Sequence, residues 1–472
     1  MKKTFIKGLV VASLLAMSGL TLTNCGGDDG AITFWHTMGQ ANQKTLNRMI
    51  EEFNKIEGNE KIKIKHAAQG DYTGIYEKLI KAIPAKTTPV MAYCYPDHVA
   101  DYIDAGAVVN LDTLINDQEI GYTSTGKDKN APDYNINDDL NDFIPAFLEE
   151  GQTYTVEGTY SLPFSKSTEV MFYNETYLID NGFVDGEGKA IVPTKWENEE
   201  DPNDYTAIIN LCRAIKAKDN KIKAPLGYDS DDNLFITFCK QLNIPYTSID
   251  SNGVGSFDFE NAEAKAMVEK VKGWYDEGLI KTKGTIEGNS YTSTLFKNEQ
   301  LVFTIGSTGG TSYNEPNKDT DGIYDFEAQV APIPTFGSEV SCISQGPSIC
   351  FFKNAKITEE QTRTAFKFYK FITSPENSAA YAILTGYEPV KSSSFETTEY
   401  QTHLNAENPE LKNKVANITR TLQENYFVSP AFIGSATARD QVGGIITQVL
   451  LNNKTIDKAF QDAKTKCLFA AM

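Results

Sequence analysis

The order of hydrophobic periodicities in the first hundred residues restricts the fold more than any other feature of the chain. Residues 32–36 are a short apolar run typical of a buried strand, and residues 46–53 repeat apolar side chains at helical spacing. Strand alternation follows at 61–66, helical spacing at 76–83 and an apolar run at 90–95. Strands that alternate with helices in this way pair in parallel through right-handed crossovers. We therefore predict an α/β domain on a mostly parallel sheet.

The spacing of apolar residues predicts further strands and helices along the rest of the chain. Residues 117–142 are rich in Asp, Asn and Gly and are expected to form surface loops. Strands are expected at 159–173, 301–305, 326–333 and 340–352. Helices are expected at 264–274, 410–423 and 438–451, and a further helix is expected to begin at a capping box formed by Thr358 and Gln361. No repeat of 20 to 50 residues is present, which excludes solenoids and propellers.

The first 24 residues have the pattern of a secretory signal peptide. A basic start at Lys2, Lys3 and Lys7 precedes the apolar run 8–22, which is too short to span a membrane stably. Cys25 follows at the cleavage position, and 25–30 is a flexible tether, as in a bacterial lipobox. We predict that the protein is exported to the cell envelope and anchored to a membrane by a lipid on Cys25. The alternative is an ordinary leader with an incidental cysteine.

Charge and metal-ligand patterns exclude several classes of function. The formal net charge of −19 becomes −22 when the leader, with three lysines and no acidic residue, is removed. Such a surface does not suit a protein that binds nucleic acid or anionic lipid through its own charge. The four histidines show no metal-ligand spacing, and the calcium-loop-like run 317–322 has Ala328 where the bidentate glutamate should stand. We predict no metal and no cofactor, and leave a Cys342–Cys350 disulfide open.

The motifs of catalysis are also absent. The chain has no phosphate-binding lysine loop, no nucleophile elbow and no metalloprotease helix motif. A secreted glycan or phosphoester hydrolase stays as the alternative from another class, with Asp97 and either Asp229 or Asp231 as the carboxylate pair. We expect no enzyme and no catalytic residue.

Aromatic and polar residues stand where the predicted parallel strands end. Trp35 and His36 close the first strand, Tyr72 follows the second, and Asp97 follows the third. The carboxyl ends of parallel strands meet at one crevice, where ligands bind in such folds. Arg439 lies among small residues, and its planar guanidinium suits a phosphate or a carboxylate; a pair with Asp440 is the alternative.

Five short segments, in order along the chain, resemble a known family. They are FWHTM at 34–38, PFSKST at 163–168, FYN at 172–174, SPEN at 374–377 and TGYEPV at 385–390. Together they resemble the extracellular solute-binding proteins of bacterial ABC importers, and within that group the sn-glycerol-3-phosphate-binding proteins.

The resemblance implies a two-lobed periplasmic-binding-protein fold. Each lobe would be a mostly parallel sheet flanked by helices, hinge strands would join the lobes, and ligand would close them. We expect the first lobe in residues 31–160 and 301–343 and the second in 161–300 and 344–472. The implied ligand contacts are Tyr72, Asp97, Ser167, Ser307, Thr308, Gly346, Tyr387 and Arg439, the last three toward a phosphate.

One segment departs from the family. Residues 227–235, GYDSDDNLF, replace a tryptophan-containing loop, and Asp229 would repel a phosphate or accept a sugar hydroxyl. The expected ligand is a glycerophosphate-like molecule or a sugar, with a neutral oligosaccharide as the alternative. The expected partners are an ABC permease and its ATPase, and the protein itself is expected to be a monomer. A sensor or adhesin without a transporter is a third possibility.

Overall fold

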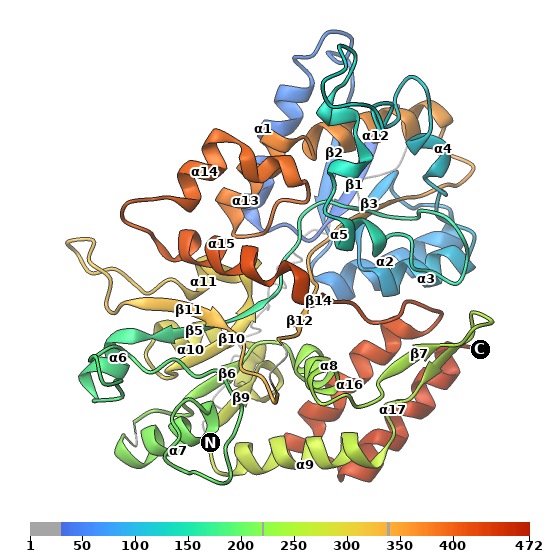
Figure 1. Ribbon diagram of the computed structural model, residues 1–472. Helices are drawn as coiled ribbons and strands as arrows, with labels where there is room; N and C mark the ends of the chain where they lie inside the picture. The colour runs from blue at the N-terminus through green and yellow to red at the C-terminus, as the bar shows by residue number, and fades with distance from the viewer. Residues whose placement is uncertain (1–29, 220, 338–339) are drawn as a thin grey trace, which may run out of the picture.

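A computed structural model describes residues 30–219, 221–337 and 340–472. The predicted signal peptide, the predicted lipidation site Cys25 and all but the last residue of the predicted tether lie outside the described residues. Within the described part, the chain forms two five-stranded sheets, flanked by helices, and two small two-stranded sheets (Figure 1). The small sheets pair β7 (Thr247–Ile249) with β8 (Gly255–Phe257) and β12 (Cys342–Ile343) with β14 (Tyr426–Phe427).

The first sheet contains the predicted strand–helix–strand–helix–strand unit. Its order is β2 (Ile64–Ala68), β1 (Ile32–His36), β3 (Met91–Cys94), β13 (Ser348–Phe351) and β4 (Leu162–Pro163). Strand β1 pairs in parallel with both β2 and β3, whereas β13 is antiparallel to its neighbours. The predicted parallel unit is confirmed, although Pro84 lies inside the last turn of its second helix rather than ending it.

Helices whose apolar faces build the first core surround this sheet. They are α1 (Gln40–Phe53), α2 (Tyr72–Ala85), α3 (Pro96–Asp104), α4 (Asp112–Ile115), α5 (Pro145–Glu149), α12 (Glu359–Ile372) and α13 (Pro375–Thr385). Helix α14 (Thr398–Leu404) packs on α13. The predicted capping box of Thr358 and Gln361 starts α12.

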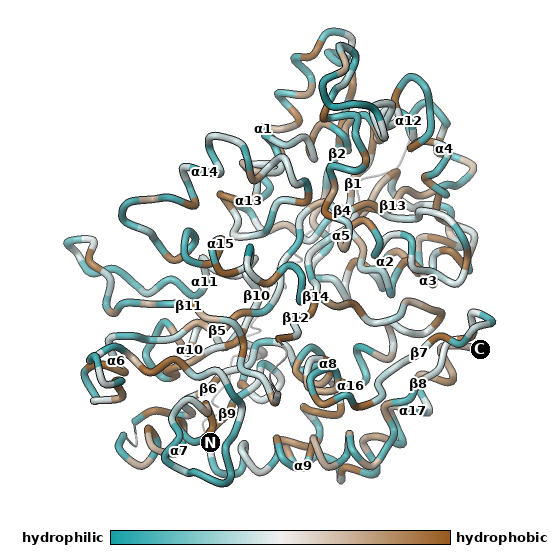
Figure 2. Tube along the Cα trace, in the orientation of Figure 1, coloured by the Kyte–Doolittle hydropathy of each residue, from teal (hydrophilic) through white to brown (hydrophobic). Residues whose placement is uncertain are grey.

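The second sheet has the order β11 (Ala328–Pro332), β5 (Glu169–Asn174), β10 (Phe303–Ser307), β6 (Leu226–Tyr228) and β9 (Ile280–Thr282). The helices with it are α6 (Glu175–Asp180), α7 (Ile208–Lys218), α8 (Asp231–Gln241), α9 (Ala262–Asp276), α10 (Thr292–Lys297), α11 (Thr311–Asn314), α15 (Leu411–Leu422), α16 (Ser435–Leu450) and α17 (Ile456–Ala470). Figure 2 shows brown and teal alternating along α9, whose apolar side faces the second core.

The division of the chain between the lobes differs from the expected one. Strands β10 and β11, expected in the first lobe, both pair with β5 in the second sheet. Strand β13 and α12, expected in the second lobe, belong to the first sheet and its core. The reason is non-local strand pairing: the chain enters the second lobe after β4 and returns to the first only at β13.

The six described cysteines are buried and free, and the structure places Cys342 and Cys350 in different sheets. The described residues contain no cluster of three or more His, Cys, Asp or Glu side chains able to hold a metal ion. None of the described helices is both long enough and apolar enough to cross a membrane.

Candidate functional site

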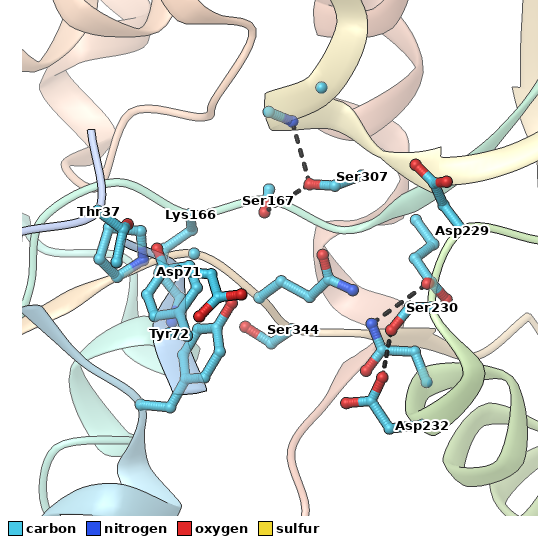
Figure 3. A pocket seen from close by; sticks show the side chains of 18 of the residues that line it. Thr37, Asp71, Tyr72, Lys166, Ser167, Asp229, Ser230, Asp232, Ser307 and Ser344 are labelled. Atoms are coloured by element: carbon cyan, nitrogen blue, oxygen red, sulfur yellow. Dashed lines mark hydrogen bonds between the residues drawn. The ribbon is translucent and has the colours of Figure 1, made fainter. Parts of the chain in front are cut away.

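A cavity of about 760 Å³ lies between the two lobes and is lined by residues of both. In Figure 3, Asp71 and Tyr72 of the first lobe face the segment of Asp229, Ser230 and Asp232 in the second. The predicted site residues that line the cavity are Tyr72, Asp97, Ser167, Asp229, Ser307, Gly346, Tyr387 and Arg439. Strand ends and hinge segments far apart in the sequence therefore meet at one place.

Three of the predicted residues do not line the cavity. His36 is fully buried, and its Nε2 lies 2.9 Å from Nδ1 of His66. Burial, with a smaller contribution from His66, lowers the pKa of His36 to about 4, so the ring is neutral. Trp35 packs against the first core, and Thr308 is buried with its hydroxyl accepting a hydrogen bond from the Thr168 amide. Trp35 and His36 point to opposite faces of β1, and Thr37, the residue after the strand end, lines the cavity instead.

Tyrosine rings form much of the wall. The lining tyrosines are Tyr72, Tyr93, Tyr95, Tyr246, Tyr291, Tyr313, Tyr381 and Tyr387. Tyr72 and Tyr95 are stacked, with ring centroids 4.1 Å apart. The buried hydroxyls of Tyr72 and Tyr93 make no hydrogen bond of standard geometry, although Tyr72 lies near Thr37 and Tyr387, and Tyr93 lies near Tyr381. These hydroxyls stay protonated because burial raises their pKa values.

Apart from Tyr72 and Tyr387, these rings were not among the predicted site residues. Tyr95 stands in the segment after the third strand, and its position at a strand end was the one signal for it. The others come from the inner part of a strand, from helices and from loops, where an aromatic residue has no pattern that separates a ligand contact from core packing.

Arg439, on α16 of the second lobe, reaches α3 of the first. Its Nε donates to Oδ2 of Asp97 at 2.9 Å, and its Nη1 lies 3.4 Å from Oδ2 of Asp232 and 2.9 Å from Oδ1 of Asn233. Burial acts to raise the pKa of Asp97, but neighbouring positive charge outweighs burial and lowers it. His98 is itself kept neutral by burial, so we attribute that charge to Arg439. The predicted alternative, a pair between Arg439 and Asp440, is not the arrangement found.

A second ion pair lies where the chain crosses between the lobes. The ammonium of Lys166 contacts a carboxylate oxygen of Glu150, and both side chains are almost fully buried. Ser344, from another crossing segment, donates its hydroxyl to the same carboxylate. These three residues join segments that are far apart in the sequence where the chain crosses between the lobes. Sequence reasoning missed it, since a lysine and a glutamate carry no local signal of burial.

Glu169 lies deeper in the cavity wall with 1% of its surface exposed. Its Oε2 accepts a hydrogen bond from the Tyr228 hydroxyl at 2.6 Å, and its Oε1 accepts one from Nδ2 of Asn233 at 3.2 Å. Burial raises the pKa of Glu169 to about 8, although both hydrogen bonds act in the opposite direction. The Asn233 amide is therefore oriented from one side by Glu169 and from the other by Arg439.

The acidic loop divides between the cavity and the protein interior. Asp229 lines the cavity while its Oδ1 accepts hydrogen bonds from the backbone and hydroxyl of Thr292 at 2.8 and 2.9 Å. Asp231 is not a lining residue and accepts hydrogen bonds from Thr282 and Gly284. Of the two carboxylate pairs considered for a hydrolase, Asp97 with Asp231 is therefore not assembled in the cavity, whereas Asp97 and Asp229 both line it.

Acidic side chains outnumber basic ones around the cavity. The lining acids are Asp71, Asp97, Glu150, Glu169, Asp229 and Asp232, and the lining bases are Lys166, Lys283 and Arg439. Lys166 is paired with Glu150, and Lys283 lies over the ring of Tyr291 at 4.2 Å. The cavity thus offers hydroxyls, carboxylates and aromatic faces rather than a concentration of positive charge.

Comparison with known proteins gives one family and one fold. The model of the family described as bacterial extracellular solute-binding protein matches residues 48–412. The chain is 23% identical over 402 residues to the sn-glycerol-3-phosphate-binding periplasmic protein UgpB of Escherichia coli strain K12, covering 83% of this chain and 81% of that protein. Among solved structures it is similar to UgpB from Mycobacterium tuberculosis in complex with glycerophosphocholine, with a TM-score of 0.69, 17% identity and coverage of 93% and 98%. Maltose-bound MalE3 of T. maritima has the same TM-score, 15% identity and coverage of 93% and 99%.

Proposed function

Because the chain belongs to the bacterial extracellular solute-binding proteins, we propose that it captures a neutral, polyhydroxylated solute, a sugar or an oligosaccharide, between its lobes. The observation that carries this proposal is the state of Arg439. It is the one arginine among the lining residues of the described structure, and it is already engaged by Asp97 and Asp232. A phosphate would have to displace or approach two carboxylates, whereas a sugar hydroxyl can donate to them.

The remaining lining groups suit the same ligand. Tyrosine faces such as that of Tyr95 pack against the apolar face of a pyranose ring, and the carboxylate of Asp229 accepts hydroxyl hydrogens. Ser167 and Ser307, whose hydroxyls lie 3.2 Å apart, present donors and acceptors from a crossing segment and the end of β10. A ligand held by groups of both lobes stabilises their closure because it binds the closed state better than the open one.

A glycerophosphodiester is the second candidate, favoured by the shared position of Arg439, Tyr387 and Gly346 on the same cavity. The relatives are consistent with either ligand class, since the protein from Escherichia coli is named for sn-glycerol 3-phosphate and MalE3 of T. maritima was solved with maltose. Even with Glu169 protonated at pH 7, the other lining acids outnumber the lining bases, and this surplus supports the neutral ligand.

The proposal extends to where the protein works. It is exported by the leader 1–24, carries a lipid on Cys25, and presents its ligand as a monomer to an ABC permease driven by a separate ATPase. It catalyses no reaction. Support comes from the order of basic start, apolar run and cysteine at the amino terminus, and from the family itself.

A thermal-shift screen of residues 26–472 tests the ligand. The panel is mono- and oligosaccharides, glycerol 3-phosphate and glycerophosphodiesters, because a ligand that binds only the folded protein raises Tm by mass action. We expect a shift with neutral sugars that is lost in Tyr72→Ala and kept in Tyr324→Ala, a tyrosine outside the cavity. A rise in Tm with phosphorylated compounds alone would support the glycerophosphodiester instead of the sugar. No rise in Tm with any compound would contradict both candidate ligands.

A further inference from the structure

The carboxylate of Asp232 controls which ligands Arg439 can bind. We infer that Asp232 is a specificity-determining residue: together with Asp97 it holds the Arg439 guanidinium in a contact between the lobes and so excludes anionic ligands from the cavity. The inference rests on the proposed function and names the residue that sets its charge preference. It concerns a position in the loop where the chain departs from the family it resembles.

The geometry gives Arg439 two negative partners on opposite lobes. Asp97 belongs to the first turn of α3 and Asp232 to the first turn of α8, and the guanidinium lies between them. The side chain of Arg439 is 22% exposed, so one part of it still faces the cavity. Its single positive charge is outweighed by the two carboxylates, and an anion that approaches the exposed part meets net negative charge.

Asp232 is held in this position by its own neighbours. The Ser230 hydroxyl donates to Oδ1 of Asp232, which leaves Oδ2 toward Arg439. The next residue, Asn233, also contacts the guanidinium and is in turn oriented by Glu169. The Asp232 carboxylate is therefore part of an ordered network and not a surface charge that happens to lie near an arginine.

The other cations of the cavity do not replace Arg439. Lys166 is buried against Glu150, and Lys283 lies over the Tyr291 ring. Among the described lining residues, Arg439 is thus the group whose charge decides whether an anion is accepted. Removing the Asp232 carboxylate leaves Arg439 with one charged partner, Asp97, and with the Asn233 amide oxygen on Nη1. The guanidinium then keeps its contact between the lobes, but two carboxylates no longer outweigh its positive charge.

The test compares Asp232→Asn with Asp440→Asn by isothermal titration with glycerol 3-phosphate at pH 7. Asp440 is a matched control because its loss removes the same charge beside Arg439 in the chain, but it is exposed and does not line the cavity. We expect Asp232→Asn to raise the affinity for glycerol 3-phosphate about tenfold or more, and Asp440→Asn to change it less than threefold. The double variant Asp232→Asn/Arg439→Met should lose the gain, since the gain depends on the guanidinium.

Equal affinities in Asp232→Asn and Asp440→Asn would overturn the inference, as would tight binding of glycerol 3-phosphate by the unaltered protein. A gain that survives in the double variant would also overturn it. Circular dichroism and Tm show whether each variant is folded, and Asp232→Ser serves as a second variant if the asparagine is not tolerated. Failure of the proposed function is a separate result, because it is judged by sugar binding to the unaltered protein.

Discussion

Replacing Glu169 by glutamine should remove a pH dependence of stability that the wild-type protein shows between about pH 5 and pH 8. Burial raises the pKa of this carboxyl from 4.5 to about 8, so the folded protein binds its proton more tightly than the unfolded chain does. The resulting stabilisation is fully present below pH 4.5 and is lost as the pH rises through about 8. The glutamine variant is neutral at every pH and lacks this effect.

The magnitude follows from the size of the shift. Where the folded protein holds the proton and the unfolded chain does not, the free energy of unfolding falls by about 1.4 kcal/mol per pH unit. Between pH 5 and pH 8 the upper limit is about 4 kcal/mol. Water that enters around an ionised carboxylate reduces this, and we expect about 2 kcal/mol.

The assay is urea-induced unfolding of both proteins, without ligand, at pH 5, 6.5, 8 and 9. The quantity compared is the difference in unfolding free energy between wild type and Glu169→Gln, because other titrating groups, including Glu388 with its raised pKa of about 7, contribute to both proteins. We expect wild type to lose stability relative to the variant as the pH rises to 8. A difference that stays constant within about 0.5 kcal/mol from pH 5 to pH 9 would refute the reasoning.

Three further outcomes are expected. Tyr72→Phe removes a buried hydroxyl that makes no hydrogen bond of standard geometry, so ligand-free stability in urea should change by less than about 1 kcal/mol while calorimetric affinity for the captured sugar falls about tenfold; unchanged affinity would contradict this. Gly309→Ala places a Cβ 2.6 Å from Cζ of Tyr387, and the displaced ring should weaken ligand binding about tenfold by titration; wild-type affinity would show that Tyr387 does not contact the ligand. Cys25→Ser should move the protein from the membrane to the soluble fraction of fractionated cells, and a protein that stays with the membrane would exclude the lipid anchor.

Local patterns predicted most of the first lobe. Strand β1, the helical spacing of α1 and the capping box of α12 each depend on residues within a few positions, so composition and spacing reveal them. The same patterns put Tyr72 and Asp97 at the carboxyl ends of parallel strands, and such ends meet at one edge of the sheet. They could not show that β10 and β11 pair with β5, because strand pairing across more than a hundred residues has no local signal.

What the sequence by itself determined is the α/β architecture and part of the set of residues around one crevice. The tertiary structure alone decided which of those residues contact one another and which charges are paired. Arg439 and Asp97 are 342 positions apart, and Arg439 and Asp232 are 207 apart. In the sequence, an arginine among small residues predicts an anion site. In the folded protein two carboxylates lie against this arginine, and the electrostatic potential that a ligand meets is the sum of the contributions of all charges nearby in space.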